Sequence, residues 1–150
     1  MSNFLVVLLV AVSGVGLSVQ VAVNSRLRET VQSPALSGLI SFAVGLVVML
    51  LLTLSGVMGR GRWVSPLETP WWYWIGGLFG ALVVTTAIVA LPKIGAGGVV
   101  AATVFGQLVT ALVLDHFGWL GVKRDPITVW KAAGAVLLLA GVLLIHHRGR

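Results

Sequence analysis

Five long apolar stretches separated by short polar segments make up almost the whole sequence. They lie at about residues 4–24, 34–55, 70–91, 97–117 and 126–145. About 20 apolar residues of helix are needed to cross the roughly 30 Å hydrocarbon core of a bilayer. The stretches are too long, and too lacking in alternation, for barrel strands, and helices satisfy their own backbone polar groups in lipid. The pattern therefore predicts an all-α integral membrane bundle of five transmembrane helices, forming a single membrane domain over residues 1–150.

The ends of these stretches carry helix signals. A residue suited to an N-cap precedes a proline suited to the first helical position at Ser33-Pro34, Thr69-Pro70 and Asp125-Pro126. We expect Pro92 to end the third span and the glycines at 95, 97 and 98 to connect it to the fourth. The loops are short, so consecutive helices are expected to be antiparallel neighbours.

Composition supports the same fold class. The chain is 58% hydrophobic and only 9% charged, whereas soluble domains carry about 25% charged residues. The net charge of +6 comes from bases that stand singly or in pairs between spans, which is typical of membrane flanks and not of a nucleic-acid surface. The absence of cysteine excludes disulfides, thiolate metal sites and cysteine nucleophiles.

The basic residues divide evenly between the two sides of the predicted bundle. We call the side that holds the loops 56–69 and 118–125 the first face, and the other side the opposite face. The first face carries Arg60, Arg62, Lys123, Arg124 and Lys131. The opposite face carries Arg26, Arg28, Lys93, Arg148 and Arg150. Because excess Lys and Arg normally fix orientation, this balance predicts insertion in both senses. A shift of Arg148 and Arg150 to the first face, if the fifth span failed to cross, would instead predict one orientation.

No internal repeat is visible, although many transporters consist of two inverted repeats. We therefore interpret the chain as one inverted-repeat unit of an antiparallel dimer. All the tryptophans and the tyrosine fall on the first face: Trp63, Trp71, Trp72, Tyr73, Trp74, Trp119 and Trp130. Interfacial anchoring explains such a belt; the alternative is a ring at the mouth of a cavity.

Small residues recur four apart on three spans, a spacing that lets membrane helices approach closely. The predicted packing positions are Gly76, Gly80, Gly98 and Gly106, with Ser37, Ser41, Gly45 and Ala102 in the same pattern.

Polar side chains within the spans are the candidate functional residues, because such groups are costly in lipid. Gln20, Asn24 and Gln107 are the predicted substrate-binding residues. For Gln20 the alternative is a hydrogen bond to a neighbouring helix, and for Asn24 an end cap. Asp115 and His116 are candidates for proton or cation coupling, with a mutual or loop partnership as the structural alternative. No carboxylate lies deeper in any span, and His146 and His147 are interpreted as a basic tail.

Several of these residues carry a family resemblance. Gln20 to Asn24, Gly76-Gly77-Leu78-Phe79-Gly80, Leu91-Pro92-Lys93-Ile94-Gly95, Gly106-Gln107 and Asp115-His116-Phe117-Gly118 resemble the YdcZ-type family, a five-span branch of the drug/metabolite transporter superfamily. The resemblance covers essentially the whole chain. It implies an exporter of the bacterial or archaeal cytoplasmic (inner) membrane that occurs as dual-topology chains, as oppositely oriented pairs or as fused ten-span proteins.

Together these observations predict a small-solute transporter that works as an inverted homodimer by alternating access. Its expected partners are a second copy of itself, the lipid bilayer and a small-molecule substrate, without nucleic acid, metal or cofactor. The alternatives are a dual-topology ion channel and a non-transporting membrane assembly subunit. An enzyme is not expected, since the sequence shows no nucleophile–base constellation and no phosphate loop.

Overall fold

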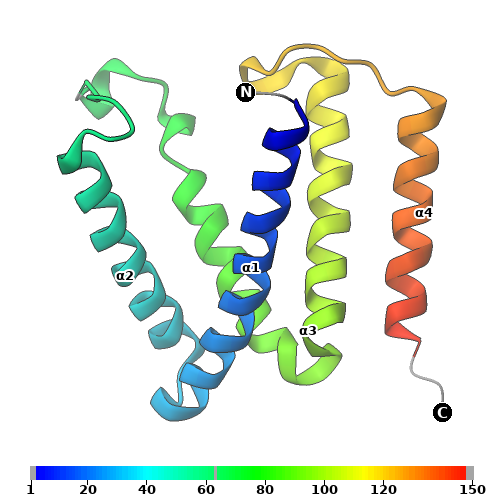
Figure 1. Ribbon diagram of the computed structural model, residues 1–150, viewed down its shortest axis with the longest axis horizontal. Coiled ribbons are helices and arrows are strands. Elements are labelled where there is room, and N and C mark those ends of the chain that lie inside the picture. The colour runs from blue at the N-terminus through cyan, green and yellow to red at the C-terminus, as the bar shows by residue number, and fades with distance from the viewer. Residues whose placement is uncertain (1–2, 63, 148–150) are drawn as a thin grey trace. The chain divides into compact units, whose positions relative to one another are not determined.

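The structure is a computed structural model that describes residues 3–62 and 64–147, with side chains from Phe4 onward. The described residues form helices and loops without strands, which confirms the all-α class (Figure 1). The elements are α1 (Asn3–Val31), α2 (Pro34–Ser55), η1 (Pro66–Glu68), η2 (Trp71–Tyr73), α3 (Gly76–Phe117), η3 (Trp119–Gly121) and α4 (Val129–His146). Four helical stretches are long and apolar enough to cross a membrane. The predictions for Trp63, Arg148 and Arg150 lie outside the described residues.

The helix α3 contains two of the predicted spans. Its 42 residues would extend about 63 Å, twice the thickness of the hydrocarbon core. Gly95 interrupts it with φ 74° and ψ 165°, a conformation that side chains with a Cβ rarely adopt. The segments on either side, 76–94 and 96–117, are each about 30 Å long. The expectation that Pro92 ends the third span is wrong: Gly95 makes the break, because Pro92 removes one donor while keeping helical dihedral angles.

Capping explains where the other helices begin. Ser33 caps α2 as predicted, since its side chain accepts a hydrogen bond from the Leu36 amide and Pro34 takes the first helical position. The predicted caps at Thr69 and Asp125 are wrong. Thr128 caps α4 by accepting from the Lys131 amide. Asp125 is instead occupied by an ion pair with Lys131 and a backbone bond to Asp115.

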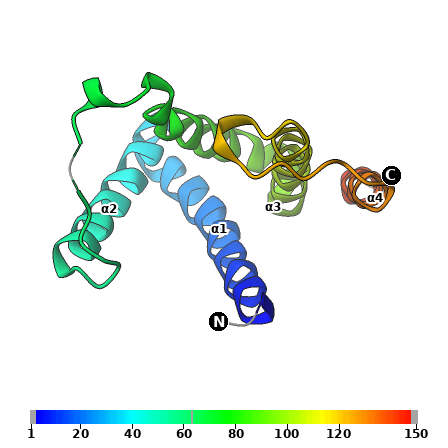
Figure 2. The ribbon, with the colours of Figure 1, turned by 90° about the horizontal axis from the view of Figure 1, so that it is seen from above.

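The chain divides into two compact units, Met1–Pro92 and Lys93–Arg150. In the first unit, α1 and α2 meet near the turn between them and diverge toward their other ends (Figures 1 and 2). At the meeting point the Ser37 hydroxyl donates a 2.7 Å hydrogen bond to the Asn24 carbonyl oxygen. This bond joins the end of the first predicted span to the beginning of the second.

The first part of α3 packs antiparallel against α2 through glycine. A Cβ added at Gly38 would lie 3.8 Å from Thr85 Oγ1, and one added at Gly80 would lie 3.7 Å from the ring of Phe42. Of the other predicted packing positions, Gly76 and Gly106 have nothing within 4 Å, and Gly98 faces Ile94 of its own helix. Gly38, which the four-residue spacing did not single out, is a buried contact of this pair.

In the second unit, α4 runs antiparallel to the last part of α3. Gly97 lies beside Ile145 at one end of the pair, and Lys131 of α4 reaches Asp125 in the loop at the other end.

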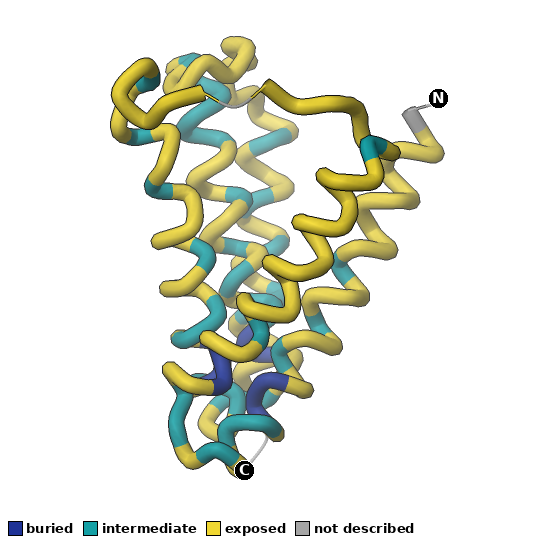
Figure 3. The backbone as a smooth tube through the Cα atoms, turned by 90° about the vertical axis from the view of Figure 1, so that its left-hand side faces the viewer, coloured by how far each residue is buried: buried dark blue, intermediate teal, exposed yellow. Residues whose placement is uncertain are grey.

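Few side chains are enclosed. Among the described residues, the buried ones of the first unit are Asn24, Ser25, Ser37, Gly38, Ala87 and Ile88. Figure 3 shows the few buried positions in dark blue on a backbone that is mostly exposed. Most apolar side chains of the four long helices are exposed instead. This is the inverse of a soluble fold, and it suits helices whose surroundings are lipid or other helices.

Candidate functional site

Gln20 and Asn24 lie one turn apart on α1 in contrasting surroundings. Gln20 is exposed on the helix surface. Asn24 is only 4% exposed and lies where α1 meets α2. The two amides are therefore at the edge and in the interior of the same junction, and they do not form one open surface.

The side-chain amide of Asn24 is buried but has no hydrogen-bond partner in the described part of the chain. The backbone carbonyl of the same residue accepts from Ser37. Buried polar groups are normally paired. Among the described residues, no fully enclosed side-chain nitrogen or oxygen lacks a partner, so the Asn24 amide must keep a narrow access to its surroundings. It is free to bind a group that enters the junction.

Arg28, one turn beyond Asn24, reaches α3. Its Nη1 donates to the backbone carbonyl oxygen of Ile88 at 3.4 Å. From the sequence pattern, Arg28 is predicted only as a flanking charge. A signal for this contact exists in the sequence, because Pro92 has no N–H and leaves the carbonyl four residues earlier without its helical donor.

Gln107 belongs to the second unit, on the last part of α3, and is exposed. One turn earlier, the Thr103 hydroxyl donates back to the Val99 carbonyl at 2.8 Å, which satisfies that hydroxyl locally. The Gln107 amide has no such partner among the described residues. Of the polar groups at this level of the helix, it is the one available to a ligand or to another chain.

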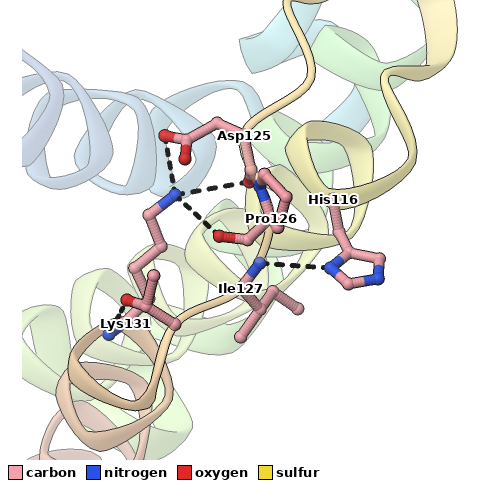
Figure 4. A network of polar contacts seen from close by, with 6 residues as sticks. His116, Asp125, Pro126, Ile127 and Lys131 are labelled. Carbon is pink, nitrogen blue, oxygen red and sulfur yellow. Dashed lines mark hydrogen bonds and ion pairs between the residues drawn. The ribbon is translucent and has the colours of Figure 1, made fainter.

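A polar network closes the other end of this unit (Figure 4). The Asp125 amide donates to the Asp115 carbonyl at 2.8 Å, and Arg124 Nε donates to the His116 carbonyl at 3.2 Å. The Ile127 amide donates to His116 Nδ1 at 3.1 Å. The first two bonds satisfy carbonyls that the end of a helix leaves free, and all three hold the loop 118–128 against the end of α3.

Asp115 and His116 differ in how far this network engages them. The His116 ring accepts at Nδ1, which places its proton on Nε2. The Asp115 carboxylate has no hydrogen bond or ion pair within residues 3–62 and 64–147. Lys131, in the first turn of α4, pairs with Asp125 instead, at 2.6 Å. Neither structural partnership considered for the Asp115 carboxylate is formed, and this half-buried acid has no partner among the described residues.

The aromatic residues gather where helices end. Trp74 Nε1 donates to Thr69 Oγ1 at 2.8 Å, and the Trp72 and Tyr73 rings meet edge to face. In the second unit the Phe117 and Trp119 rings are stacked. Most of these rings are exposed, as expected of side chains at the membrane interface. Among the described residues there is also no group of three His, Asp or Glu side chains placed to hold a metal ion.

Comparisons with known proteins agree with this architecture. Residues 5–144 match the family model described as "Putative inner membrane exporter, YdcZ". The chain is 31% identical over 150 residues to the inner membrane protein YdcZ of Escherichia coli (strain K12), covering 99% of each protein. No solved structure matches the chain. The family match spans all four long apolar helices, and the relative is similar from end to end. The chain therefore belongs to the YdcZ family of inner-membrane exporters, as the resemblance in its sequence implied.

Proposed function

We propose that the protein exports a small solute as an antiparallel homodimer that works by alternating access. Each copy crosses the bilayer five times, through α1, α2, the two segments of α3 on either side of Gly95, and α4. Two copies inserted in opposite senses supply the two halves that other transporters encode as inverted repeats. Gln20 and Gln107 face the cavity between them, and Asn24 lies beside it in the α1–α2 junction, where its amide binds a group that enters.

One observation carries this proposal: Gln20 and Gln107 are exposed amides on helices that are otherwise apolar. An amide that faced lipid would be costly, so such residues face the interior of a bundle or a polar cavity. The first unit and the second unit each contain one. Covering them requires another surface, and a cavity that binds a solute between two copies provides it.

The charges support the inverted arrangement. Five Lys and Arg residues flank each face, so neither orientation is favoured. The chain also encloses few large apolar side chains, among them Ile88, which is fully buried. Such sparse burial within one copy is consistent with helices that pack against a second copy.

The chemistry of the proposed cavity points to a small amphipathic or cationic solute. Its candidate contacts are neutral amides, and the basic residues lie at the ends of the helices. A phosphate or a polyanion would need a cluster of bases within the spans. The unpaired Asp115 carboxylate is the group through which export is coupled to a proton or a cation.

The substitution Gln107→Leu tests the cavity. It removes the amide while keeping the volume similar, so we expect the purified protein to dimerise but to lose transport in proteoliposomes. Val109→Leu, an apolar exchange two residues away on the same helix, is the matched control and should transport normally. Normal efflux by the Gln107→Leu protein would contradict the proposed site.

The antiparallel arrangement has its own test. Reporters fused to the C-terminus, one active only in the cytoplasm and one active only outside it, should both be active in cells. Cross-links between copies should join residues from opposite faces. Activity of only one reporter would contradict the antiparallel arrangement of the dimer. Ion flux at a rate too fast for a conformational cycle would overturn alternating access and favour a channel.

A further inference from the structure

We propose that Arg28 is a positioning residue that supplies the hydrogen bond which Pro92 cannot make, and that this contact controls how α3 flexes between Pro92 and Gly95. The contact follows from backbone chemistry and does not depend on the transport function. Its consequence for the transport rate rests on the proposed function above.

The argument begins at the Ile88 carbonyl. In an α-helix the amide four residues later would donate to it, but that residue is Pro92, which has no N–H. Ile88 is 0% exposed, so water does not replace the missing donor. Arg28 Nη1 lies 3.4 Å from this oxygen. A charged side chain from another helix thus completes the hydrogen-bond ladder of α3.

The surroundings of Arg28 hold it in this role. The helix α1 continues past the predicted span to Val31, which carries Arg28 to the level of Ile88. Four residues earlier, the bond between the Ser37 hydroxyl and the Asn24 carbonyl fixes the α1–α2 junction. The neighbouring Arg26 is exposed and paired with Glu29. Arg28 is half-buried, and within the described residues its guanidinium has no acidic partner.

The contact between Arg28 and Ile88 lies where it can affect the bending of α3. Residues 88–94 keep helical dihedral angles, and the break follows at Gly95. Helices bend most readily at proline, where a ladder bond is missing. A donor that can engage or release the Ile88 carbonyl therefore decides whether this turn is held or free to bend, and a few such residues are enough to form a hinge.

The pair Arg28 and Pro92 allows a decisive double-mutant cycle. Pro92→Ala restores an N–H where the backbone is already helical, so the Ile88 carbonyl regains an internal donor. We expect Arg28→Gln to increase amide hydrogen exchange of residues 89–91, 93 and 94 by about tenfold in the natural background, because bonds from charged donors are the stronger ones. In the Pro92→Ala background the same change should alter exchange less than about twofold. Arg26→Gln is the matched control and should have no effect in either background.

Two outcomes would overturn the proposal. One is an equal effect of Arg28→Gln in both backgrounds, which would show that Arg28 acts elsewhere. The other is unchanged exchange in the natural background. A spin label at Ala96→Cys, in a chain without other cysteines, reports the same flexing independently and should become more mobile only when Pro92 is present and Arg28 is lost.

The transport assay separates this proposal from the function it builds on. Arg28→Gln should change the turnover rate several-fold while leaving KM unchanged, since the contact does not touch solute, and Arg28→Lys should restore part of the effect. A change in KM with unchanged turnover would contradict the positioning role. If no form of the protein transports, the proposed function fails, and the exchange cycle still decides whether Arg28 serves the Ile88 carbonyl.

Discussion

The His116 ring ties a loop to a helix through a single acceptor atom. With Nδ1 accepting from the Ile127 amide, the ring must be neutral at that nitrogen, because a protonated Nδ1 would be a second donor facing the first. The neighbouring groups that bear charge are Arg124, which bonds the His116 carbonyl, and the free Asp115 carboxylate. The ring therefore holds the loop as a hydrogen-bond acceptor.

We predict that His116→Leu destabilises the fold by about 1 kcal/mol, the usual net value of one hydrogen bond, and increases proteolysis of the loop 118–128. His116→Asn keeps an acceptor near the position of Nδ1 and should retain most of the stability. Thermal unfolding in detergent measures the first effect, and limited proteolysis measures the second. Equal behaviour of the two variants would show that the ring acts by packing and not as an acceptor.

A separate prediction concerns the neighbouring residue Asp115. Asp115→Asn removes the charge but keeps the shape, so we expect transport to lose its dependence on the pH gradient while solute binding persists. The measurement is efflux from proteoliposomes with and without the gradient. Asp125→Asn, which breaks the ion pair with Lys131 but leaves Asp115 intact, is the control and should keep the dependence. Unchanged coupling in the Asp115→Asn protein would exclude this carboxylate.

Sequence alone identifies these polar residues but not their roles. Asp115 and His116 are visible as the last polar groups of a span. The acceptor role of His116 depends on a loop eleven residues away, whose path no local pattern specifies. The same holds for the role of Arg28. The sequence shows that Pro92 lacks a backbone donor, but the side chain that replaces this donor depends on how α1 packs against α3.

At the scale of elements, the packing of α2 on α3 depends on glycines that face side chains. Gly80→Val is predicted to destabilise the first unit by about 1–3 kcal/mol, the usual cost of overpacking, because a Cβ at this position already contacts the Phe42 ring at 3.7 Å and valine adds two methyl groups beyond it. Gly77→Val has nothing within 4 Å and serves as the control. Unfolding in a denaturing detergent compares them. Equal losses would show that helix propensity, and not contact with Phe42, governs this site.

The elements also show where hydrophobic periodicity succeeds and where it fails. The predicted bounds of α2, 34–55, agree with Pro34–Ser55, because a serine cap, a proline and Gly56 with positive φ mark both ends. The third and fifth stretches carry similar marks at Thr69-Pro70 and Asp125-Pro126, but the helices do not begin there: η2 precedes α3, and Asp125 forms loop contacts instead of a cap. Apolar length predicts that a helix exists, whereas competing hydrogen bonds decide the residue at which it begins.

At the scale of the whole molecule, orientation depends on a small difference in charge. With the five spans proposed above, each face has five basic residues, so a change of two should be enough to bias insertion. Met58→Lys with Leu67→Lys adds two charges to the exposed loop of the first face. Arg62→Gln with Lys123→Gln removes two exposed charges from the same face. The first pair gives seven basic residues on the first face against five on the opposite face. The second pair gives three on the first face against five on the opposite face.

We predict that each charge-biased pair inserts predominantly in one sense and loses most of its transport when expressed alone, because a copy without an inverted partner has only half of the cavity. Expressed together, the two variants should insert in opposite senses and restore transport as a mixed dimer. C-terminal reporters measure the orientation, and solute efflux from the same cells measures activity. Full transport by either biased variant alone would mean that copies in one orientation suffice, and would contradict the antiparallel dimer even if the family's export function holds.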